Sequence, residues 1–300
     1  MVTVTERRAM VEHLQTAHSF SERHACELVD FARSSQRYEA RRPDSPQLRE
    51  RLGTLARERP RFGYRRLKIM LDREGFHVNH KRVYRLYTLA GLKLRGKRSK
   101  RRCGERRGPI VTAQAVNDRW SMDFVSDRLA DGRAFRAFAA VDDFGKRCTA
   151  IEVDTSLPGV RVIRALERAI EMYGKPRRLV MDNGPEFTCR AFVAWIVRRG
   201  IEPCWIEPGK PIQNAYAESF NSRFRDECLN QHVFLDLPEA RDLIEEWRVD
   251  YNAIRPHSSL GGLAPDEFSS LRSTGVPVER SELSDPSPEE NQKPETRRLS

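Results

Sequence analysis

Short runs in the middle of the chain alternate between apolar and polar residues, which is the pattern of a β-strand with one buried face. Residues 119–127, RWSMDFVSD, predict a first strand in which Trp120, Met122 and Phe124 alternate with Asp123 and Val125. Two further apolar runs flank the sequence Asp-Phe-Gly-Lys, which suits a tight turn. We therefore expect a second and a third strand that form a β-hairpin.

Helical periodicity follows this hairpin and then alternates with short apolar runs. Pro158 opens a helix that Gly174 closes. The next expected elements are a buried strand, a helix, a strand and another helix, at 177–182, 189–200, 201–206 and from Asn214 onward. Three strands followed by helix, strand, helix, strand and helix predict an α/β, ribonuclease-H-like fold, which is a mixed five-stranded sheet with flanking helices.

The N-terminal part of the chain predicts small all-α modules. Residues 19–40 contain a helical pattern, a break and a second helix, which is the order of a helix-turn-helix. A linker with two prolines, RPDSPQ, precedes a clearer helical pair at 63–75 and 80–91. Gly75 and Gly91 end these two helices, and Asn79 caps the second. We expect this second pair to be a DNA-binding helix-turn-helix module.

Basic charge is concentrated in the same part of the chain. The 300 residues contain 54 Lys and Arg against 43 Asp and Glu, a net charge of +11. Residues 1–110 hold 28 basic and 12 acidic residues, whereas residues 111–300 hold 26 and 31. This asymmetry favours a nucleic-acid-binding front end joined to a catalytic body over a merely soluble basic surface.

Two sets of basic residues are the candidates for DNA contact. The second helical pair carries Arg65, Arg66, Lys68, Lys81, Arg82 and Arg85. The alternative for this pair is a helical bundle with solvated charges, but its second helix has no compensating acids. Residues 93–107 contain nine basic residues and one acid, so this connector forms no core and lies along DNA or is a solvated tether. Its candidate contacts are Lys97, Arg98, Lys100, Arg101 and Arg102.

These patterns divide the chain into six expected segments. They are an N-terminal helical segment (1–45), a helix-turn-helix module (46–92), a basic linker (93–113), a catalytic core (114–232), a C-terminal helical extension (233–270) and a disordered tail (271–300). The extension contains an amphipathic helix at 239–251, and the tail is rich in Ser, Pro and Glu.

Three carboxylates lie on different predicted elements of the core. Asp123 lies in the middle of the first strand, Asp182 at the end of the fourth, and Glu218 on the helix that follows Asn214. Open α/β sheets place ligands near strand ends, and the turn DNGPEF presents Asp182 there. A phosphodiester is a poor electrophile, so enzymes that cut one commonly use two divalent cations held by carboxylates. The sequence therefore predicts a two-metal site.

Helical geometry gives Glu218 a basic neighbour. At about 100° per residue, the apolar stripe of its helix consists of Ala217, Phe220, Phe224 and Cys228. Glu218 and Arg225 point together about a quarter-turn from this stripe, about 10 Å apart along the helix. Arg225 is therefore placed to hold a DNA phosphate beside the metals. Taken singly, each of these residues is more often an ordinary surface residue, and only their combination with the strand order favours catalysis.

Other acids in the core are given structural or supporting roles. We assign Asp142 and Asp143 to the hairpin turn and Glu186 to a group that supports the metal ligands. The segment RPHSSL, residues 255–260, either packs against the core or contacts DNA.

Several motifs carry a resemblance to a known family. WSMDF, MDNGPEF, PGKPIQNAYAESFNSRFRDECLN and YNAIRPHSSLGGLAPDEF resemble the integrase-core transposases of bacterial insertion sequences, of the OrfB type with a retroviral-integrase-like (rve) DDE core. RFGYRRLKIMLDREGFHVNHKRVYRLY resembles the helix-turn-helix segment that precedes this core. The resemblance implies a catalytic triad of Asp123, Asp182 and Glu218 with Arg225 as its basic partner.

The resemblance also implies a reaction and partners. A DDE transposase cleaves DNA at insertion-sequence ends and joins the freed 3′-OH to target DNA by in-line phosphoryl transfer. The implied cofactor is Mg²⁺, as two ions for which Mn²⁺ can substitute. The implied partners are double-stranded DNA, further copies of this chain on that DNA, and an upstream-frame helix-turn-helix protein joined by ribosomal frameshifting.

Two other functions are compatible with these patterns. One is a non-catalytic DNA-binding regulator of transposition, and the other is a ribonuclease H or junction nuclease on the same fold. The six cysteines contain no Cys-x-x-Cys pair, and no apolar stretch is long enough to cross a bilayer. We expect a cytoplasmic, nucleoid-associated bacterial protein without a membrane partner.

Overall fold

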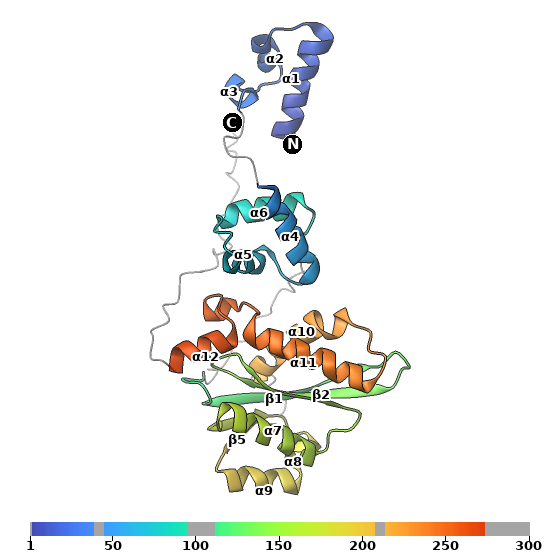
Figure 1. Ribbon diagram of the computed structural model, residues 1–300, viewed down its shortest axis with the longest axis vertical. Helices are drawn as coiled ribbons and strands as arrows, with labels where there is room; N and C mark the ends of the chain where they lie inside the picture. The colour runs from blue at the N-terminus through green and yellow to red at the C-terminus, as the bar shows by residue number, and fades with distance from the viewer. Residues whose placement is uncertain (1, 39–44, 95–111, 208–213, 274–300) are drawn as a thin grey trace, which may run out of the picture. The chain divides into compact units, whose positions relative to one another are not determined.

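The computed structural model describes residues 2–38, 45–94, 112–207 and 214–273 (Figure 1). Contacts divide the chain into two compact units, Met1–Gly53 and Thr54–Ser300, which are described separately. The boundary falls within helix α4 (Pro46–Glu58). The five candidate DNA contacts of the basic connector, at positions 97, 98, 100, 101 and 102, and the tail after residue 273 lie outside the described residues.

The first unit contains three helices before α4. They are α1 (Val4–His18), α2 (Glu22–Leu28) and α3 (Arg33–Gln36). Thr3 caps α1, because its side chain accepts a hydrogen bond from the backbone N–H of Glu6. Val11, Ala25 and Cys26 form the buried centre of this unit. The helix pair expected within residues 19–40 corresponds to α2 and α3, and α1 is an additional helix.

The second unit begins with the expected helical pair. Helices α5 (Tyr64–Arg73) and α6 (His80–Leu89) pack together through buried apolar residues. Asn79 caps α6, since its Oδ1 accepts from the backbone N–H of Lys81 at 2.9 Å. Each helix ends two residues before a glycine with positive φ, Gly75 for α5 and Gly91 for α6, close to the ends that the sequence predicts.

A mixed five-stranded sheet forms the core of this unit, in the order β3-β2-β1-β4-β5. Its strands are β1 (Arg119–Arg128), β2 (Ala134–Asp142), β3 (Cys148–Asp154), β4 (Arg178–Met181) and β5 (Glu202–Trp205). β2 pairs antiparallel with both β1 and β3. β4 pairs parallel with both β1 and β5. The expected ribonuclease-H-like order of elements is confirmed.

Helices cover both faces of the sheet (Figure 1). One face carries α7 (Gly159–Tyr173), α8 (Pro185–Thr188) and α9 (Arg190–Arg199), and the other carries α10 (Ala215–Glu227), α11 (Leu237–Ala253) and α12 (Pro265–Ser273). The 3₁₀ turn η2 (Leu229–Gln231) lies between α10 and α11, and η3 (Ser258–Leu260) lies between α11 and α12.

The alternation of β1 decides which side chains meet which helices. Trp120 and Met122 belong to the cluster shared with α7 and α9, whereas Val125 belongs to the cluster shared with α10 and α11. Because successive side chains of a strand point to opposite faces, Asp123 shares the α10 face with Val125.

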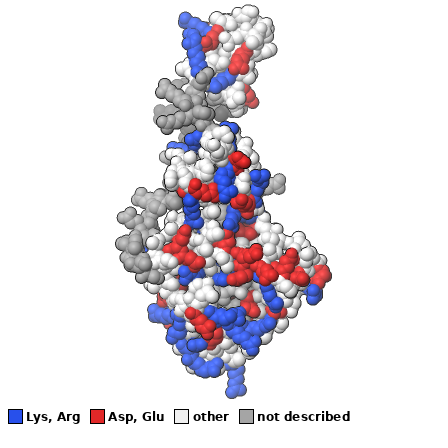
Figure 2. All heavy atoms as spheres, viewed as in Figure 1, with Lys and Arg blue, Asp and Glu red and all other residues white. Residues whose placement is uncertain are grey.

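The outer surface of α11 is acidic. Figure 2 shows Asp and Glu side chains gathered over this helix, which contributes Glu239, Asp242, Glu245, Glu246 and Asp250. Such a surface repels a DNA backbone, so DNA contacts are expected on other parts of the molecule.

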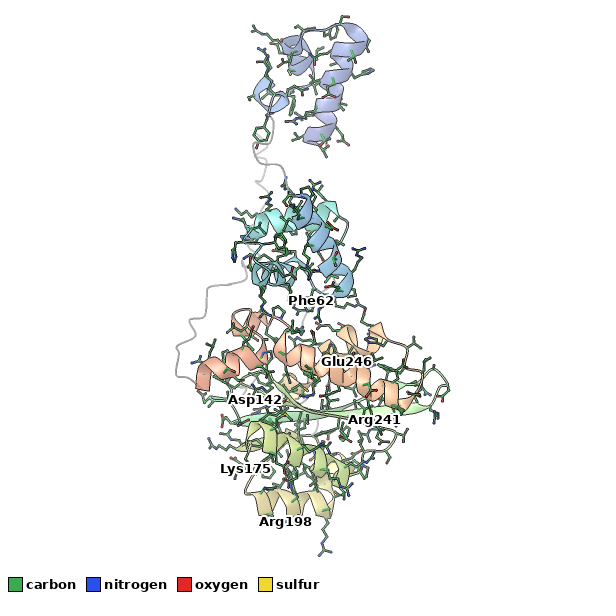
Figure 3. All side chains as sticks on the ribbon, viewed as in Figure 1. Phe62, Asp142, Lys175, Arg198, Arg241 and Glu246 are labelled. Atoms are coloured by element: carbon green, nitrogen blue, oxygen red, sulfur yellow. The ribbon has the colours of Figure 1, made fainter. Side chains whose placement is uncertain are left out.

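The two acids assigned to the hairpin turn are buried there. Asp142 (Figure 3) accepts hydrogen bonds from the backbone N–H groups of Asn117, Phe144 and Gly145. Asp143 accepts from Ser121 Oγ at 2.8 Å and pairs with Arg119 Nε at 2.6 Å. Burial raises the pKa of Asp143 to about 7, against the lowering effect of those two partners. Both carboxylates therefore hold the turn.

Gly159, the first residue of α7, lies against the backbone of α8. A Cβ atom at this position would lie 2.6 Å from the carbonyl oxygen of Glu186. We predict that Gly159→Ala lowers the free energy of unfolding by about 1–3 kcal/mol. Gly53→Ala is the control, because nothing lies within 4 Å of that Cβ and alanine favours a helix by up to about 1 kcal/mol. Chemical denaturation of both variants measures this, and equal stabilities would contradict the close approach.

Candidate active site

The register of the sheet sets Asp123 beside Asp182. The last parallel pair of β1 and β4 is Ser121 with Val180. Asp123 follows Ser121 by two residues, and Asp182 follows Val180 by two residues. Neighbouring strands lie about 4.8 Å apart. Asp182 directly follows β4, and its Oδ1 accepts from the backbone N–H of Gly184 at 3.0 Å. The two carboxylates therefore come from adjacent strands at the same level of the sheet.

Three polar contacts fasten α10 along β1. Near its start, Asn214 Nδ2 donates to the carbonyl oxygen of Met122 at 3.0 Å. In the middle, Asn221 Nδ2 donates to Asp123 Oδ2 at 2.8 Å. Arg225 Nη2 donates to the carbonyl oxygen of Ser126 at 3.1 Å. Glu218 precedes Asn221 by three residues, so the two lie on the same side of the helix.

The negative charges of the other two acids act on Asp123. The pKa of Asp123 is raised, first by burial and then by the negative charges of Asp182 and Glu218. Its hydrogen bonds from Phe124 N–H and Asn221 act in the opposite direction. A cation at this place would remove the repulsion and favour the ionised carboxylates.

The ligand types suit a hard divalent cation. Within the described ranges, no three His, Cys, Asp or Glu side chains converge closely enough to enclose a metal ion. The donors are nevertheless carboxylate oxygens from three elements, which is the ligand type that Mg²⁺ prefers. The Oδ1 atoms of Asn214 and Asn221 are also buried without a hydrogen-bond partner in the described part of the chain, and they can accept from water around a cation.

Sequence patterns did not indicate Asn221. Its position one helical turn after Glu218 was the available signal, since residues three apart on a helix are neighbours. Arg225 is exposed, as its expected role requires, but it also anchors α10 to β1. Glu186 pairs with Arg136, whose guanidinium lies 4.2 Å from the centre of the Phe124 ring. Phe124 packs on the α7 and α9 face of the sheet, opposite Asp123, so the expected support of the metal ligands by Glu186 stays a prediction.

The structure modifies the expected DNA-facing set at two residues. Arg66 Nη1 donates to Glu227 Oε1 at 3.0 Å, and Lys68 Nζ pairs with Asp72 at 2.5 Å. Acidic partners within the protein therefore neutralise both charges. For the other four members DNA contact stays a prediction. Three of them, Arg65, Lys81 and Arg85, are exposed, and Arg82 is half-buried.

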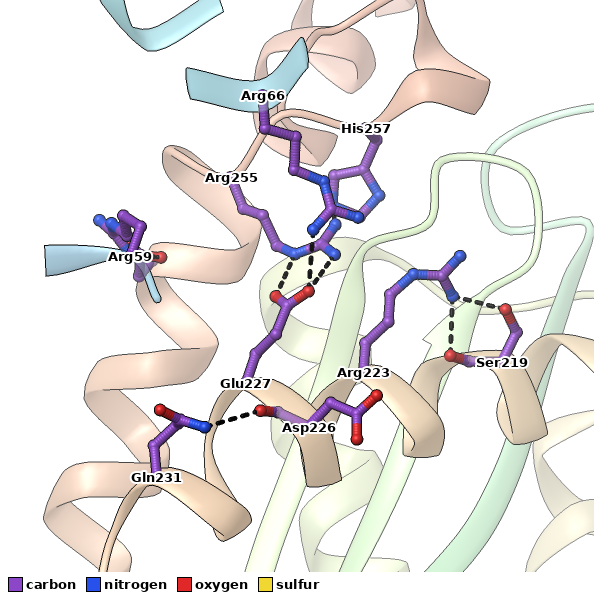
Figure 4. A network of polar contacts seen from close by, with 10 residues as sticks. Arg59, Arg66, Ser219, Arg223, Asp226, Glu227, Gln231, Arg255 and His257 are labelled. Carbon is purple, nitrogen blue, oxygen red and sulfur yellow. Dashed lines mark hydrogen bonds and ion pairs between the residues drawn. The ribbon is translucent and has the colours of Figure 1, made fainter. Parts of the chain in front are cut away.

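Glu227, the last residue of α10, is the centre of a buried polar network (Figure 4). Arg255 donates to it through Nε at 2.5 Å and Nη2 at 2.6 Å, in addition to the contact from Arg66. The Arg255 side chain is 2% exposed and that of Glu227 is 10% exposed. The segment RPHSSL therefore packs against the core through its arginine.

Other residues of the α5 region reinforce this connection. Arg59 pairs with Asp250 of α11, and Arg73 donates to the carbonyl oxygen of Ile254 at 2.6 Å and to Glu267 at 2.7 Å. The helix-turn-helix module is thus bonded to three elements of the core side: α10, α11 and α12.

His257 lies beside this network as a neutral group. Burial, followed by the charges of Arg255, Arg223 and Arg66, lowers its pKa to about 2. It contacts Arg255 Nη1 through Nε2 at 3.3 Å, where a neutral imidazole can accept a hydrogen bond.

Family models match most of the chain. One described as an HTH-like domain matches residues 47–102. Two described as an integrase core domain match residues 113–211 and 199–265. Together they cover the helical pair, the sheet with Asp123 and Asp182, and the helix that carries Glu218. Among the described helices, none is both long enough and apolar enough to cross a membrane.

Proteins of several insertion elements are similar to this chain over most of its length. The 31.7 kDa protein of insertion element IS407 from Burkholderia multivorans is 49% identical over 83% of this chain and 91% of its own length. The 39.2 kDa protein of insertion element IS476 from Xanthomonas euvesicatoria is 48% identical over 87% of this chain and 75% of its own length. The transposase for insertion sequence element IS904 from Lactococcus lactis is 25% identical over 71% of this chain and 89% of its own length.

A solved structure shares the fold. A chain of the simian T-cell lymphotropic virus intasome, in complex with PP2A regulatory subunit B56 gamma, superimposes with a TM-score of 0.50 and 15% sequence identity. The match covers 83% of this chain and 80% of that one.

The burial of Glu227 generates a stability prediction. Removing one member of a buried ion pair leaves an uncompensated charge, so Glu227→Ala should lower the free energy of unfolding by about 3–5 kcal/mol. Glu202→Ala is the control, because Glu202 is 59% exposed and its ion pair with Arg178 should contribute less than about 1 kcal/mol. Urea denaturation followed by tryptophan fluorescence tests both variants. A loss at Glu227 no larger than that at Glu202 would refute the assigned role.

Proposed function

Because this chain belongs to the OrfB-type insertion-sequence transposases with an integrase core, we propose that it is a DDE transposase. It would cut DNA at the ends of an insertion sequence and join the freed 3′-OH to target DNA. The main support is the register that places Asp123 beside Asp182, together with the Asn221 contact that holds the helix of Glu218 against Asp123.

We propose that Asp123, Asp182 and Glu218 are the metal ligands. Two bound Mg²⁺ ions, or Mn²⁺ in their place, would supply positive charge to activate water and to stabilise the attacking and leaving oxygens. The raised pKa of Asp123 supports the assignment, because a carboxylate close to two other acids is stabilised in its charged form by a cation.

Other residues of the chain position the reacting groups. Phe124 N–H and Asn221 Nδ2 each hold one oxygen of Asp123, which fixes the orientation of that carboxylate. Arg225, on the Glu218 side of α10, would hold a neighbouring DNA phosphate through the N–H groups that do not bond Ser126. In-line attack then requires only that the two oxygens be aligned, since no covalent enzyme intermediate forms.

The helix-turn-helix module would hold double-stranded DNA of the element ends or the target. Lys81, on the first turn of α6, is exposed and is our principal candidate for phosphate contact, with Arg65, Arg82 and Arg85 around it. We further propose that copies of the chain assemble on DNA and that an upstream-frame helix-turn-helix protein contributes end recognition.

The triad is tested with Asp182→Asn. Asparagine keeps an oxygen that can accept from Gly184 N–H but loses the charge that binds the cation, so the fold should persist. Strand transfer on element-end DNA with Mg²⁺ should fall at least about 100-fold. Asp127→Asn is the matched control, since Asp127 is an acid of the same strand as Asp123 and should leave the rate within about twofold.

Either of two results would reject this assignment. Equal strand transfer by wild type and Asp182→Asn would remove Asp182 from the site. DNA binding without any triad-dependent cutting or joining would identify the chain as a non-catalytic DNA-binding regulator.

Phosphate contact by the module is tested through salt dependence. A residue that contacts one phosphate contributes about one unit to the slope of log affinity against log salt concentration. We predict that Lys81→Ala reduces the slope by about one, whereas Lys68→Ala, whose charge Asp72 already neutralises, leaves it nearly unchanged. Fluorescence anisotropy with a labelled duplex measures both, and equal slopes in the two variants would place the DNA elsewhere.

A further inference from the structure

A cavity of about 470 Å³ lies beside α10, away from Glu218. Its lining includes Lys146 from the β2–β3 turn, Tyr216, Ser219 and Arg223 from α10, Ser259, and Arg272 from α12. At about 100° per residue, Tyr216, Ser219 and Arg223 occupy the flank of α10 opposite Glu218, Asn221 and Arg225. The helix therefore separates this cavity from the three carboxylates.

The described carboxylates form no direct ion pair with the cations of the cavity, although the charges of Asp143 and Asp142 act on Lys146 from nearby. Among the described residues, no acid lies within ion-pair distance of Lys146, Arg223 or Arg272. Asp143 is the one carboxylate in the described lining, and it is paired with Arg119. Arg223 turns toward the carbonyl oxygen of Ser219 at 2.7 Å, away from Glu227 (Figure 4).

Lys146 is held in an unusual and partly desolvated position. Its backbone is left-handed, with a φ of 57°, which is uncommon for a residue with a side chain. Its Nζ donates to the carbonyl oxygen of Asp143 and lies 3.9 Å from the centre of the Tyr216 ring. Burial lowers its pKa to about 8, against the raising effect of the negative charges of Asp143 and Asp142. The positive charge of Arg223 is a smaller cause that also lowers this pKa. An anion between the lysine and the arginine would relieve this repulsion.

We propose that Lys146 and Arg223 bind one phosphate of a DNA strand that crosses the outer surface of α10 from the carboxylate site. This role rests on the proposed transposase function. The exposed outer surface of α10 between the two flanks carries the small residue Ser222, over which a strand can pass. The guanidinium of Arg223 and the hydroxyl of Ser219 supply hydrogen-bond donors for phosphate oxygens.

The size and lining of the cavity fit a nucleotide segment. Pockets for small ligands measure about 300–1,000 Å³, and this cavity lies within that range. Tyr216 and the side chain of Phe144 provide apolar surface beside the cations, as single-stranded DNA sites commonly do. A strand bound there would be fixed on both sides of Glu218's helix.

Single-phosphate replacement tests the proposal in the full-length protein. Each phosphate of a labelled element-end DNA with a single-stranded overhang is replaced in turn by an uncharged methylphosphonate. Affinity is measured by fluorescence anisotropy in EDTA, so that no cutting occurs. In the wild type, we expect one position at which replacement weakens binding about tenfold. In Arg223→Ala and Lys146→Ala, the same replacement should have no further effect.

Control variants separate this contact from general effects of charge or folding. Lys146→Arg keeps the cation and should keep the sensitivity to replacement. Arg164→Ala removes an exposed arginine of α7 on the opposite face of the sheet, and its replacement profile should match that of the wild type. Circular dichroism establishes that each variant is folded.

The outcomes are distinguishable. If every methylphosphonate replacement weakens DNA binding by Arg223→Ala and by Lys146→Ala as much as DNA binding by the wild type, the pocket does not bind a DNA phosphate. Arg223-dependent binding of inorganic phosphate, without any Arg223-dependent position in DNA, would make it a site for a free anion and overturn the proposal. The replacement profile of Asp182→Asn should match that of the wild type, because the pocket does not include Asp182. Such a match supports the phosphate contact even if the wild type shows no strand transfer.

Discussion

The contact between the Glu227 carboxylate and two guanidinium groups determines where α10 ends. The same helix is fixed near its start by Asn214 and in its middle by Asn221, so its position along β1 is set at three levels. The position of Glu218 relative to Asp123 depends on these contacts, which keep the helix from sliding or rotating. Since Glu227 is nearly buried, the network excludes the water that would otherwise weaken it. The proposed catalytic position of the exposed Glu218 side chain thus depends on a buried ion pair.

Like charges gather on both flanks of α10. The negative charges of Asp182 and Glu218 act on Asp123 on one side, and the positive charge of Arg223 acts on Lys146 on the other. A ligand of opposite charge would offset the repulsion at each place. Unfavourable local electrostatics of this kind are typical of functional sites, because binding supplies the missing counter-charge.

Much of the fold could be predicted because its signals are local. Strand alternation placed Asp123 opposite Met122, and helical spacing separated Glu218 from the buried Phe220. The start of α4 was missed because Pro46 suggests a linker, although proline is well tolerated in the first turn of a helix. The partners of Arg66 could not be predicted, since Glu227 lies 161 residues away and exposed and buried arginines look alike in sequence. The contact of Asn221 with Asp123 likewise required the tertiary structure.

The left-handed backbone of Lys146 shows where stability and binding compete. A residue with a side chain costs about 1 kcal/mol or more in this conformation, whereas glycine adopts it readily. If the contacts of the Lys146 amine are left aside, random mutagenesis selected only for heat resistance would therefore favour glycine at this turn. Selection for DNA joining would act in the opposite direction. A substitution at position 146 that makes this protein more thermostable would thus also lower its proposed affinity for DNA.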